Sequence, residues 1–185
     1  MKTATITIVG VSPLSQSRPL NSPKGPKETS DDHEKRTWKE RAHVDTDGRP
    51  FIPPMAFKNC LSEIAKFLSV QIPGKGKATY TKHFEAGILA MEPMLIDGVG
   101  TEIEGEWLYV PADGRRGGPK RVWKCFPIWR KWGGTVTVHV LDDTITTDIF
   151  EHHLREAGRF IGVGRFRPRN NGFYGRFDVV KIAWS

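Results

Sequence analysis

The chain has 185 residues, of which 38% are hydrophobic, and this is enough for one domain with an ordinary core. Its formal net charge of +7 at pH 7 favours a polyanionic partner, because neutralising phosphates releases counterions. Cys60 and Cys125 lie far apart without zinc-binding spacing, and no segment has the roughly 20 apolar residues of a membrane span, so a soluble cytoplasmic protein without disulfide, metal or cofactor is expected.

The first predicted element is a strand over residues 4–11, where isoleucine and threonine alternate with a period of two. Residues 14–50 lose this pattern, since prolines punctuate a Ser/Lys stretch that leads into a charged run around Trp38. Loops of this length are uncommon in compact domains unless they are functional or disordered. We therefore interpret residues 14–50 as an inserted excursion, either disordered or ordered against a partner.

A strong helix is predicted after Phe51-Ile52-Pro53-Pro54. Pro54 is acceptable in the first turn of a helix, and apolar residues recur at three-and-four spacing from Phe57 to Leu68. This pattern indicates one buried face. Residues 80–91 and 106–111 then predict strands, although the sequence does not indicate how they pair.

A basic insertion is expected near residues 112–131, where a flexible loop at 113–121 precedes a predicted strand at 122–128. Gly133-Gly134 opens the next strand, in which valines alternate with polar residues up to Leu141. Both segments add β-structure to the second half of the chain.

A second helix is predicted from Asp148, which stands three residues before Glu151 as in a capping box, to Gly158, which suits a left-handed C-cap. Residues 177–184 form a last β-rich strand. Its apolar residues Val179, Val180 and Ile182 are expected to join the core.

The order of these elements favours an α+β fold with a ferredoxin-like or RRM-like βαββαβ core and long basic insertions. Residues 1–185 would then form a single domain. In such a fold the sheet and the loop after the second helix are the surfaces that contact single-stranded nucleic acid in RNA-recognition domains.

The glycine-rich segment, defined here as residues 162–177 (GVGRFRPRNNGFYGRF), contains four glycines, four arginines and four aromatic residues. Glycine lets another backbone approach closely, arginine offers a planar fork of donors for phosphate, and aromatic rings stack on bases. The segment therefore predicts a nucleic-acid contact. The alternative is a glycine-rich hairpin whose arginines are simply solvated.

The arginines of this segment are expected to contact phosphate, because the glycines around them permit close approach. They are Arg165, Arg167, Arg169 and Arg176, and Gly162 and Gly164 are expected to belong to the same site. Phe173 and Tyr174 are expected either to stack on bases or to anchor the segment. Phe166 and Phe177 are expected in the core, because they stand at strand-like positions.

Three further sets of residues extend this prediction. The second basic cluster consists of Arg115, Arg116, Lys120, Arg121 and Lys124, and it predicts contacts to a passing backbone or a solvated face. Lys58, near the start of the first helix, could hold a phosphate there or be an ordinary surface lysine. Trp38 among cations, with Arg36 and Arg41, suits a partner or nucleic-acid surface.

The chain resembles the RAMP superfamily of CRISPR-associated proteins, especially its crRNA-binding backbone subunits. Residues 51–61 (FIPPMAFKNCL) are similar to the family's approach to its first helix, and residues 158–177 are similar to the glycine-rich loop after its second helix. The resemblance covers about half of the chain and implies a loop that touches the RNA backbone. Pro54-Met55-Ala56 departs from the family's common Gly-Ser-Ser, so the resemblance does not extend to the family's usual RNA contact at that turn.

A catalytic role would need a histidine, because endoribonucleases of this superfamily often use one as general acid or base. His43 and His83 are the candidates, since each lies near cations that stabilise charge. His152-His153 has no third ligand nearby in sequence, so a metal site is not indicated. Asp31-Asp32 favours a capping or solvated role. No strong catalytic constellation is present.

These observations predict a non-catalytic protein that binds single-stranded RNA, with single-stranded DNA as the alternative ligand. The resemblance implies homo-oligomers along the strand, or a subunit of a ribonucleoprotein complex. One alternative function is a phage-encoded mimic or inhibitor of a CRISPR effector complex. The other is a metal-independent endoribonuclease.

Overall fold

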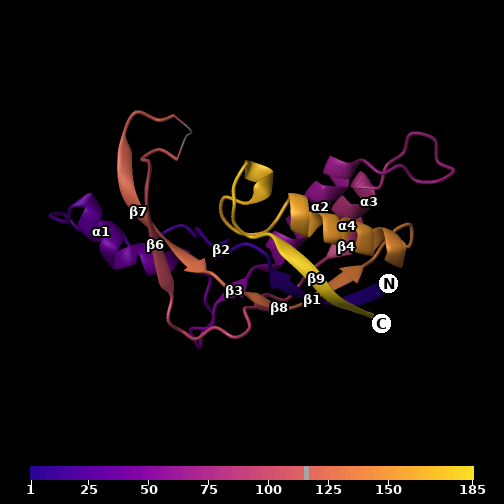
Figure 1. The fold of residues 1–185 in the computed structure, drawn as a ribbon, viewed down its shortest axis with the longest axis horizontal. Coiled ribbons are helices and arrows are strands. Elements are labelled where there is room, and N and C mark those ends of the chain that lie inside the picture. Colours follow the sequence, from indigo (N-terminus) through magenta and orange to yellow (C-terminus); the bar gives the residue numbers. More distant parts are fainter. Residues whose placement is uncertain (115–116) are drawn as a thin grey trace.

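The computed structural model describes residues 1–114 and 117–185. A sheet covered by helices forms one end of the molecule, and a β-hairpin with a short helix beside it forms the other (Figure 1). The glycine-rich segment lies between these two parts.

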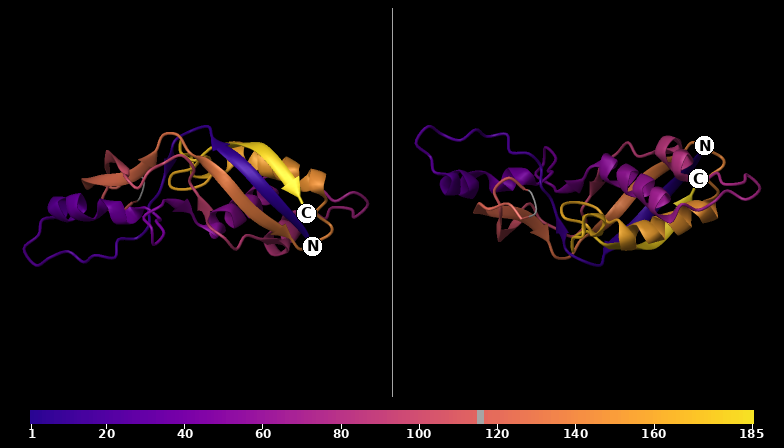
Figure 2. Two further views of the ribbon diagram at one scale, coloured as in Figure 1. Left: turned by 90° about the horizontal axis from the view of Figure 1, so that it is seen from below. Right: turned by 90° about the horizontal axis from the view of Figure 1, so that it is seen from above.

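The first part is a four-stranded antiparallel sheet in the order β4-β8-β1-β9. Its strands are β1 (Lys2–Gly10), β4 (Ile88–Leu89), β8 (Gly133–Val140) and β9 (Phe177–Trp184). Helices α2 (Pro54–Leu68) and α4 (Thr147–Phe160) cover one face of this sheet (Figure 2). Along the chain these elements run β1, α2, β4, β8, α4, β9, which is the ferredoxin-like order that was predicted.

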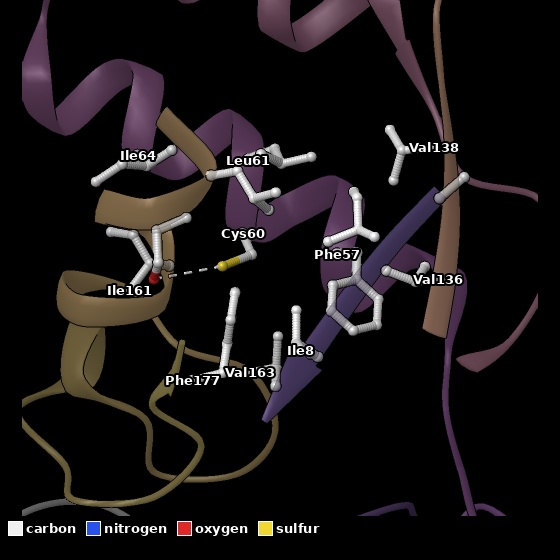
Figure 3. Packing of buried hydrophobic residues seen from close by; sticks show 14 of the residues in the cluster. Ile8, Phe57, Cys60, Leu61, Ile64, Val136, Val138, Ile161, Val163 and Phe177 are labelled. Atoms are coloured by element: carbon white, nitrogen blue, oxygen red, sulfur yellow. Dashed lines mark hydrogen bonds between the residues drawn. The ribbon is translucent and has the colours of Figure 1, made fainter. Parts of the chain in front are cut away.

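The core lies between the two helices and the sheet (Figure 3). Phe57, Cys60 and Leu61 of α2 are buried against the sheet, as the three-and-four spacing predicted. The thiol of Cys60 donates a hydrogen bond to the carbonyl oxygen of Ala157 on α4, with 3.8 Å between the two atoms. Burial raises the pKa of this thiol to about 12, so Cys60 packs as an apolar residue.

Helix α4 differs from the prediction at both ends. Thr146, rather than Asp148, is the N-cap, and its hydroxyl accepts a hydrogen bond from the backbone N–H of Ile149. Gly158 is not a C-cap but lies within the helix, where the backbone of Phe177 packs directly against it. Glycine is needed there for the close approach of β9 and not for a left-handed conformation.

Residues 80–91, predicted as a strand, form helix α3 (Thr81–Gly87) followed by the short strand β4. Tyr80 and Phe84 are both buried. Their spacing of four places both rings on one side of a helix, and this packing outweighs the β-propensity of the segment. In the last strand, Val180 is 63% exposed and stays outside the core, whereas Val179 is buried as expected.

The second part is built around a three-stranded antiparallel sheet in the order β2-β7-β6. It contains β2 (Leu14–Ser15), β6 (Glu104–Pro111) and β7 (Arg121–Trp129), and the last two form a long hairpin in which Tyr109 pairs with Trp123. Both hairpin strands were predicted. Two short strands, β3 (Phe51–Ile52) and β5 (Met94–Leu95), pair separately beside the core.

The excursion over residues 14–50 is ordered against its own chain. Helix α1 (Ser30–Thr37) and the 3-10 helix η1 (Trp38–Arg41) pack beside β7. Glu34 is buried and accepts two hydrogen bonds from the Arg41 guanidinium, at 2.7 and 3.0 Å, and one from the backbone N–H of Cys125 at 2.9 Å. A buried ion pair in which both carboxylate oxygens accept hydrogen bonds fixes the excursion on the hairpin.

Candidate nucleic-acid interface

Two cavities meet along the glycine-rich segment. The first, here called the α2 cavity, has a volume of about 320 Å³ and lies where α2 begins. The second, the hairpin cavity, has a volume of about 740 Å³ and lies between the glycine-rich segment and the β6–β7 hairpin. Ser17 and Arg165 line both cavities. We call the two cavities together the trough.

The glycine-rich segment follows α4 and folds back on itself. Val163 donates a backbone hydrogen bond to Gly175 at 3.0 Å, and Gly175 donates to Pro13 at 2.8 Å. Gly164 has φ +84°, and a Cβ there would lie 2.5 Å from the carbonyl oxygen of Ser15. Glycine is therefore required at position 164 by a close backbone contact with the excursion, whose residues Leu14, Gln16 and Ser17 line the trough.

Arg165 occupies the wall that the two cavities share. Its guanidinium carbon lies 3.6 Å from the ring centroid of Phe126 on β7 and 5.7 Å from that of Tyr174. Burial lowers the pKa of Arg165. Its Nη1 has no hydrogen-bond partner among the described residues. A stacked guanidinium with a free N–H is suited to donate a hydrogen bond to a phosphate oxygen.

Tyr174 links the segment to the hairpin. Its hydroxyl donates a hydrogen bond to the Glu106 carboxylate of β6 at 2.5 Å. Burial, together with this bond to an anion, raises the pKa of Tyr174. Tyr174 is only 8% exposed, whereas its neighbour Phe173 is 56% exposed. Tyr174 thus holds the anchoring position, while Phe173 is exposed with its ring at a steep angle to that of Tyr174, the two centroids 5.4 Å apart.

The other arginines of the segment lie in different surroundings. Arg167 lines the α2 cavity, but its guanidinium donates to the Glu63 carboxylate of α2 at 2.6 Å. Arg169 is 3.8 Å from the second oxygen of the same carboxylate. Arg176 donates to the backbone carbonyl of Arg159 at 3.2 Å and lines neither cavity. Arg165 is therefore the arginine of the segment that faces both cavities without an ion-pair partner among the described residues.

The second basic cluster meets the glycine-rich segment across the trough. Arg121 and Lys124 of β7 line the hairpin cavity opposite residues of that segment, while Lys120 is exposed nearby and lines neither cavity. Arg115 and Arg116 fall outside the described residues. Neither cavity is lined by an acidic residue of the described ranges. Arg121 and Arg165, which are 44 positions apart in the sequence, thus line one cavity.

Lys58 and the predicted partner surface lie elsewhere. The ammonium group of Lys58 donates to the carbonyl oxygens of Phe84 and Glu85, at 3.3 and 2.6 Å, and so caps the C-terminal end of α3. Arg41 is buried with Glu34, which gives it an internal role. The two remaining residues of that surface, which were predicted to bind a partner, are Arg36, paired with Glu28 at 2.8 Å, and Trp38, half-buried near Gly105.

The two candidate histidines are in different places. His43 lines the α2 cavity, and burial lowers its pKa, with a smaller effect from Arg18. His83 lies on α3, lines neither cavity, and contacts Asp142 through Nδ1 at 2.6 Å. This contact lowers the pKa of Asp142. Of the two histidines, only His43 stands beside the glycine-rich segment.

The uncovered face of the four-stranded sheet differs from a base-stacking platform. It carries threonines on adjacent strands, and the hydroxyls of Thr7 and Thr135 are 3.4 Å apart. The partly exposed positions of β1 and β8 on this face hold Thr, Val or His rather than Phe, Tyr or Trp. The aromatic residues that line a basic surface are those of the trough instead.

Sequence reasoning missed several residues of the trough. Gln16 is buried and bridges the excursion, since it donates to the carbonyl of Phe51 and accepts from the backbone N–H of His43, each at 2.7 Å. Phe166 was expected in the core but is 47% exposed and lines the hairpin cavity. One indication in the sequence that the backbone around Phe166 is unusual is the pair of nearby glycines, Gly164 and Gly172.

Across the described ranges, no group of three or more His, Cys, Asp or Glu side chains is arranged to hold a metal ion. Among the same residues, no helix is long and apolar enough to cross a membrane.

Comparison with known proteins gave matches at the level of structure alone. No family model matches the chain, and no curated protein matches its sequence. Cmr6 from Pyrococcus furiosus is 14% identical with a TM-score of 0.49, and the match covers 97% of this chain and 99% of Cmr6. A Cas6 product complex is 13% identical with a TM-score of 0.35, covering 97% of this chain and 50% of that one.

A chain from a CRISPR RNA-guided surveillance complex is 11% identical with a TM-score of 0.40, and the match covers 97% of this chain and 66% of that one. The sequence identity of all three matches is low, and each TM-score is below 0.5.

Proposed function

We propose that this protein binds single-stranded nucleic acid, RNA in the first place, without catalysing a reaction. The observation that carries the proposal is the position of Arg165, whose stacked guanidinium lines both cavities and has a donor free among the described residues. Arg121 and Lys124 line the same trough, and a strand passing along it would meet cations on both walls.

The start of α2 adds a second feature suited to phosphate. Met55 and Ala56, in the first turn of this 15-residue helix, line the α2 cavity. The N-cap is Pro53, whose side chain makes no capping hydrogen bond. Pro54 has no N–H, and the N–H of Ala56 donates to the carbonyl of Pro53 at 3.0 Å, so the N–H of Met55 is the donor of this first turn that can bind an anion. The helix start and Arg165 together make the α2 cavity a suitable seat for a backbone phosphate.

Membership of a ribonucleoprotein complex, with repeated copies along one strand, is the form of action that the RAMP resemblance suggests. Light scattering of the protein mixed with RNAs of increasing length tests this, because the number of bound copies should rise in steps with RNA length. A protein that binds no RNA, but co-purifies with a host CRISPR complex, would instead act as a mimic or inhibitor.

The direct test is fluorescence anisotropy with matched single-stranded RNA, single-stranded DNA and duplex at two salt concentrations. Arg165→Ala is compared with the parent, and Lys181→Ala is the control. Lys181 is an exposed residue of β9 that lines neither cavity, so its substitution removes one positive charge outside the trough. We expect salt-sensitive single-strand binding that Arg165→Ala weakens by about tenfold or more, in line with hydrogen bonds to charged groups. Lys181→Ala should bind like the parent.

The absence of binding to any of these ligands would exclude the proposal. Equal weakening by the two variants would mean that binding follows total charge rather than the trough. In that case Arg165 has no special role.

A second candidate is a metal-independent endoribonuclease, and the observation that favours it is the place of His43 in the α2 cavity near Arg165 and Arg167. A half-buried histidine beside cations has the groups needed for general acid–base cleavage. RNA cleavage in the presence of a chelator, lost in His43→Ala and retained in His83→Ala, would establish this activity. Intact RNA after prolonged incubation would rule it out.

A further inference from the structure

Phe166 has a backbone conformation that is unusual for a bulky residue. Its φ angle is +45°, in the left-handed region, where an L-residue with a large side chain is strained. Phe166 is also 47% exposed, so burial of its ring in the core does not explain the conformation. Strained backbone of this kind persists only where its surroundings impose it, and it is concentrated at ligand sites.

The surroundings that impose this conformation belong to the glycine-rich segment. The preceding residue, Arg165, donates its backbone N–H to the carbonyl of Ser15 at 2.7 Å. The carbonyl of Phe166 accepts from the N–H of Tyr174 at 3.3 Å, and a Cβ at Gly172 would collide with that carbonyl. The backbone of Phe166 is thus held on both sides, and its side chain is directed by the fold rather than by packing of the ring.

Phe166 lines the hairpin cavity together with Phe173 and Asn170. Phe173 is 56% exposed, so the segment presents two exposed phenylalanines and one amide to the same cavity. The cations lining it are Arg121, Lys124 and Arg165, and no acidic residue of the described ranges does so. This combination of exposed rings, an amide and cations fits a ligand that carries both a planar heterocycle and negative charge.

We infer that the hairpin cavity holds one unstacked nucleobase of the bound strand, which stacks on Phe166 and Phe173 while the Asn170 amide hydrogen-bonds to its edge. This inference rests on the proposed function, because Arg165 and Lys124 must hold the adjoining phosphates. A base is the part of a single strand that needs an aromatic surface, and an amide can both donate to and accept from a base edge.

The test uses anisotropy with a single-stranded RNA and with an oligonucleotide of the same length composed of abasic residues. Phe166→Ala and Phe166→Gly both remove the ring, and Phe166→Trp keeps an aromatic surface. Phe160→Ala is the matched control, because Phe160 is also 47% exposed but lies on α4 and lines neither cavity.

We expect Phe166→Ala and Phe166→Gly to weaken RNA binding equally, by about fivefold to a hundredfold, which is the range of base–aromatic stacking. Phe166→Trp and Phe160→Ala should bind like the parent. The glycine variant should melt at a higher temperature than the alanine variant, since glycine accepts a positive φ. On the abasic strand all Phe166 variants should match the parent, whereas Arg165→Ala should weaken binding to both strands.

A merely structural role for Phe166 would give a different pattern, in which the RNA affinity of each variant follows its melting temperature. The Phe166→Gly variant would then bind RNA more tightly than the Phe166→Ala variant. That result would overturn the inference, as would full RNA affinity in Phe166→Ala. If Arg165→Ala still weakens binding in either case, the proposed function stands without the base site. No binding of any strand by the parent would overturn both.

Discussion

The guanidinium carbon of Arg165 lies 3.6 Å from the ring centroid of Phe126, so a cation of the glycine-rich segment stacks on the hairpin. Arg41 approaches the same ring, with its guanidinium carbon 5.3 Å from the centroid. Phe126 therefore receives cations from the excursion and from the glycine-rich segment. One buried ring connects three stretches of sequence and fixes the position of Arg165, which lines both cavities of the trough.

Arg165→Lys should separate charge from stacking. Lysine keeps the positive charge but lacks the planar group that lies on Phe126 and the fork of donors. We expect an RNA affinity between those of the parent and Arg165→Ala. The slope of log K against log salt should match the parent for lysine and fall by about 0.7 for alanine, the change for one phosphate contact to a single strand. Equal slopes for alanine and the parent would contradict a phosphate contact at Arg165.

Tyr174→Phe should destabilise the fold, because the variant leaves the Glu106 carboxylate without the hydrogen bond that Tyr174 donates at 2.5 Å. A hydrogen bond to a charged group contributes about 1.5–3 kcal/mol, and we expect the free energy of unfolding in urea to fall by this amount. Tyr109→Phe is the control, because Tyr109 lies on β6, the strand of Glu106, and its side chain is 50% exposed. A similar decrease in the free energy of unfolding in both variants would contradict a specific stabilising effect of the Tyr174–Glu106 hydrogen bond.

The elements of the core could be predicted from the sequence because their signals are local. The signal for β1 and β8 is the alternation of residues along one strand, and the signal for α2 is the three-and-four spacing of its apolar residues. Both patterns can be recognised from residues that are close together in the sequence. The last strand was predicted for the same reason. Residues 80–91 were misread because short apolar runs fit a helix and a strand equally well, and the packing of Tyr80 and Phe84 decides between them.

The trough itself could be predicted only in part. The glycine-rich segment and the second basic cluster were identified as separate surfaces, but their meeting across one cavity depends on the Tyr174–Glu106 bond and on the Phe126 ring, which are long-range contacts. Gln16 carried no local signal, since its role comes from two backbone partners far along the chain. Pairing of distant segments is set by the whole fold rather than by the residues next to them.

Stability should fall on acidification because of His153. This residue is fully buried, its Nδ1 lies 2.7 Å from the carbonyl of Ile149, and its Nε2 has no partner among the described residues. Burial lowers the pKa of His153. The hydrogen bond with Ile149 raises this pKa, and the nearby His152 lowers it further, but burial has the largest effect. The unfolded chain, with a histidine pKa near 6.5, therefore binds the proton first.

It follows that His153 contributes stability above about pH 6.5, and that this contribution is lost as the pH falls toward its folded pKa, by up to about 1.4 kcal/mol per pH unit. Melting curves at several pH values between 7.5 and 5 test this in the parent and in His153→Gln, which does not titrate. The difference between the two proteins should shrink or reverse at acid pH. His43, whose pKa is also lowered by burial, adds a decline of the same sign in both proteins. A constant difference would contradict the prediction.

Gly158→Ala should destabilise the protein, although the same change in an exposed helix interior stabilises by about 0.5–1 kcal/mol. The reason is the contact with β9, because a Cβ at Gly158 would lie 2.9 Å from a ring carbon of Phe177 and closer still to its backbone carbonyl. The backbone carbonyl cannot rotate away as a flexible side chain would, so α4 and β9 must move apart. Overpacking of this kind costs about 1–3 kcal/mol. Thermal unfolding should therefore show a lower melting temperature in Gly158→Ala, and a higher one would mean that α4 and β9 are less tightly packed than the structure indicates.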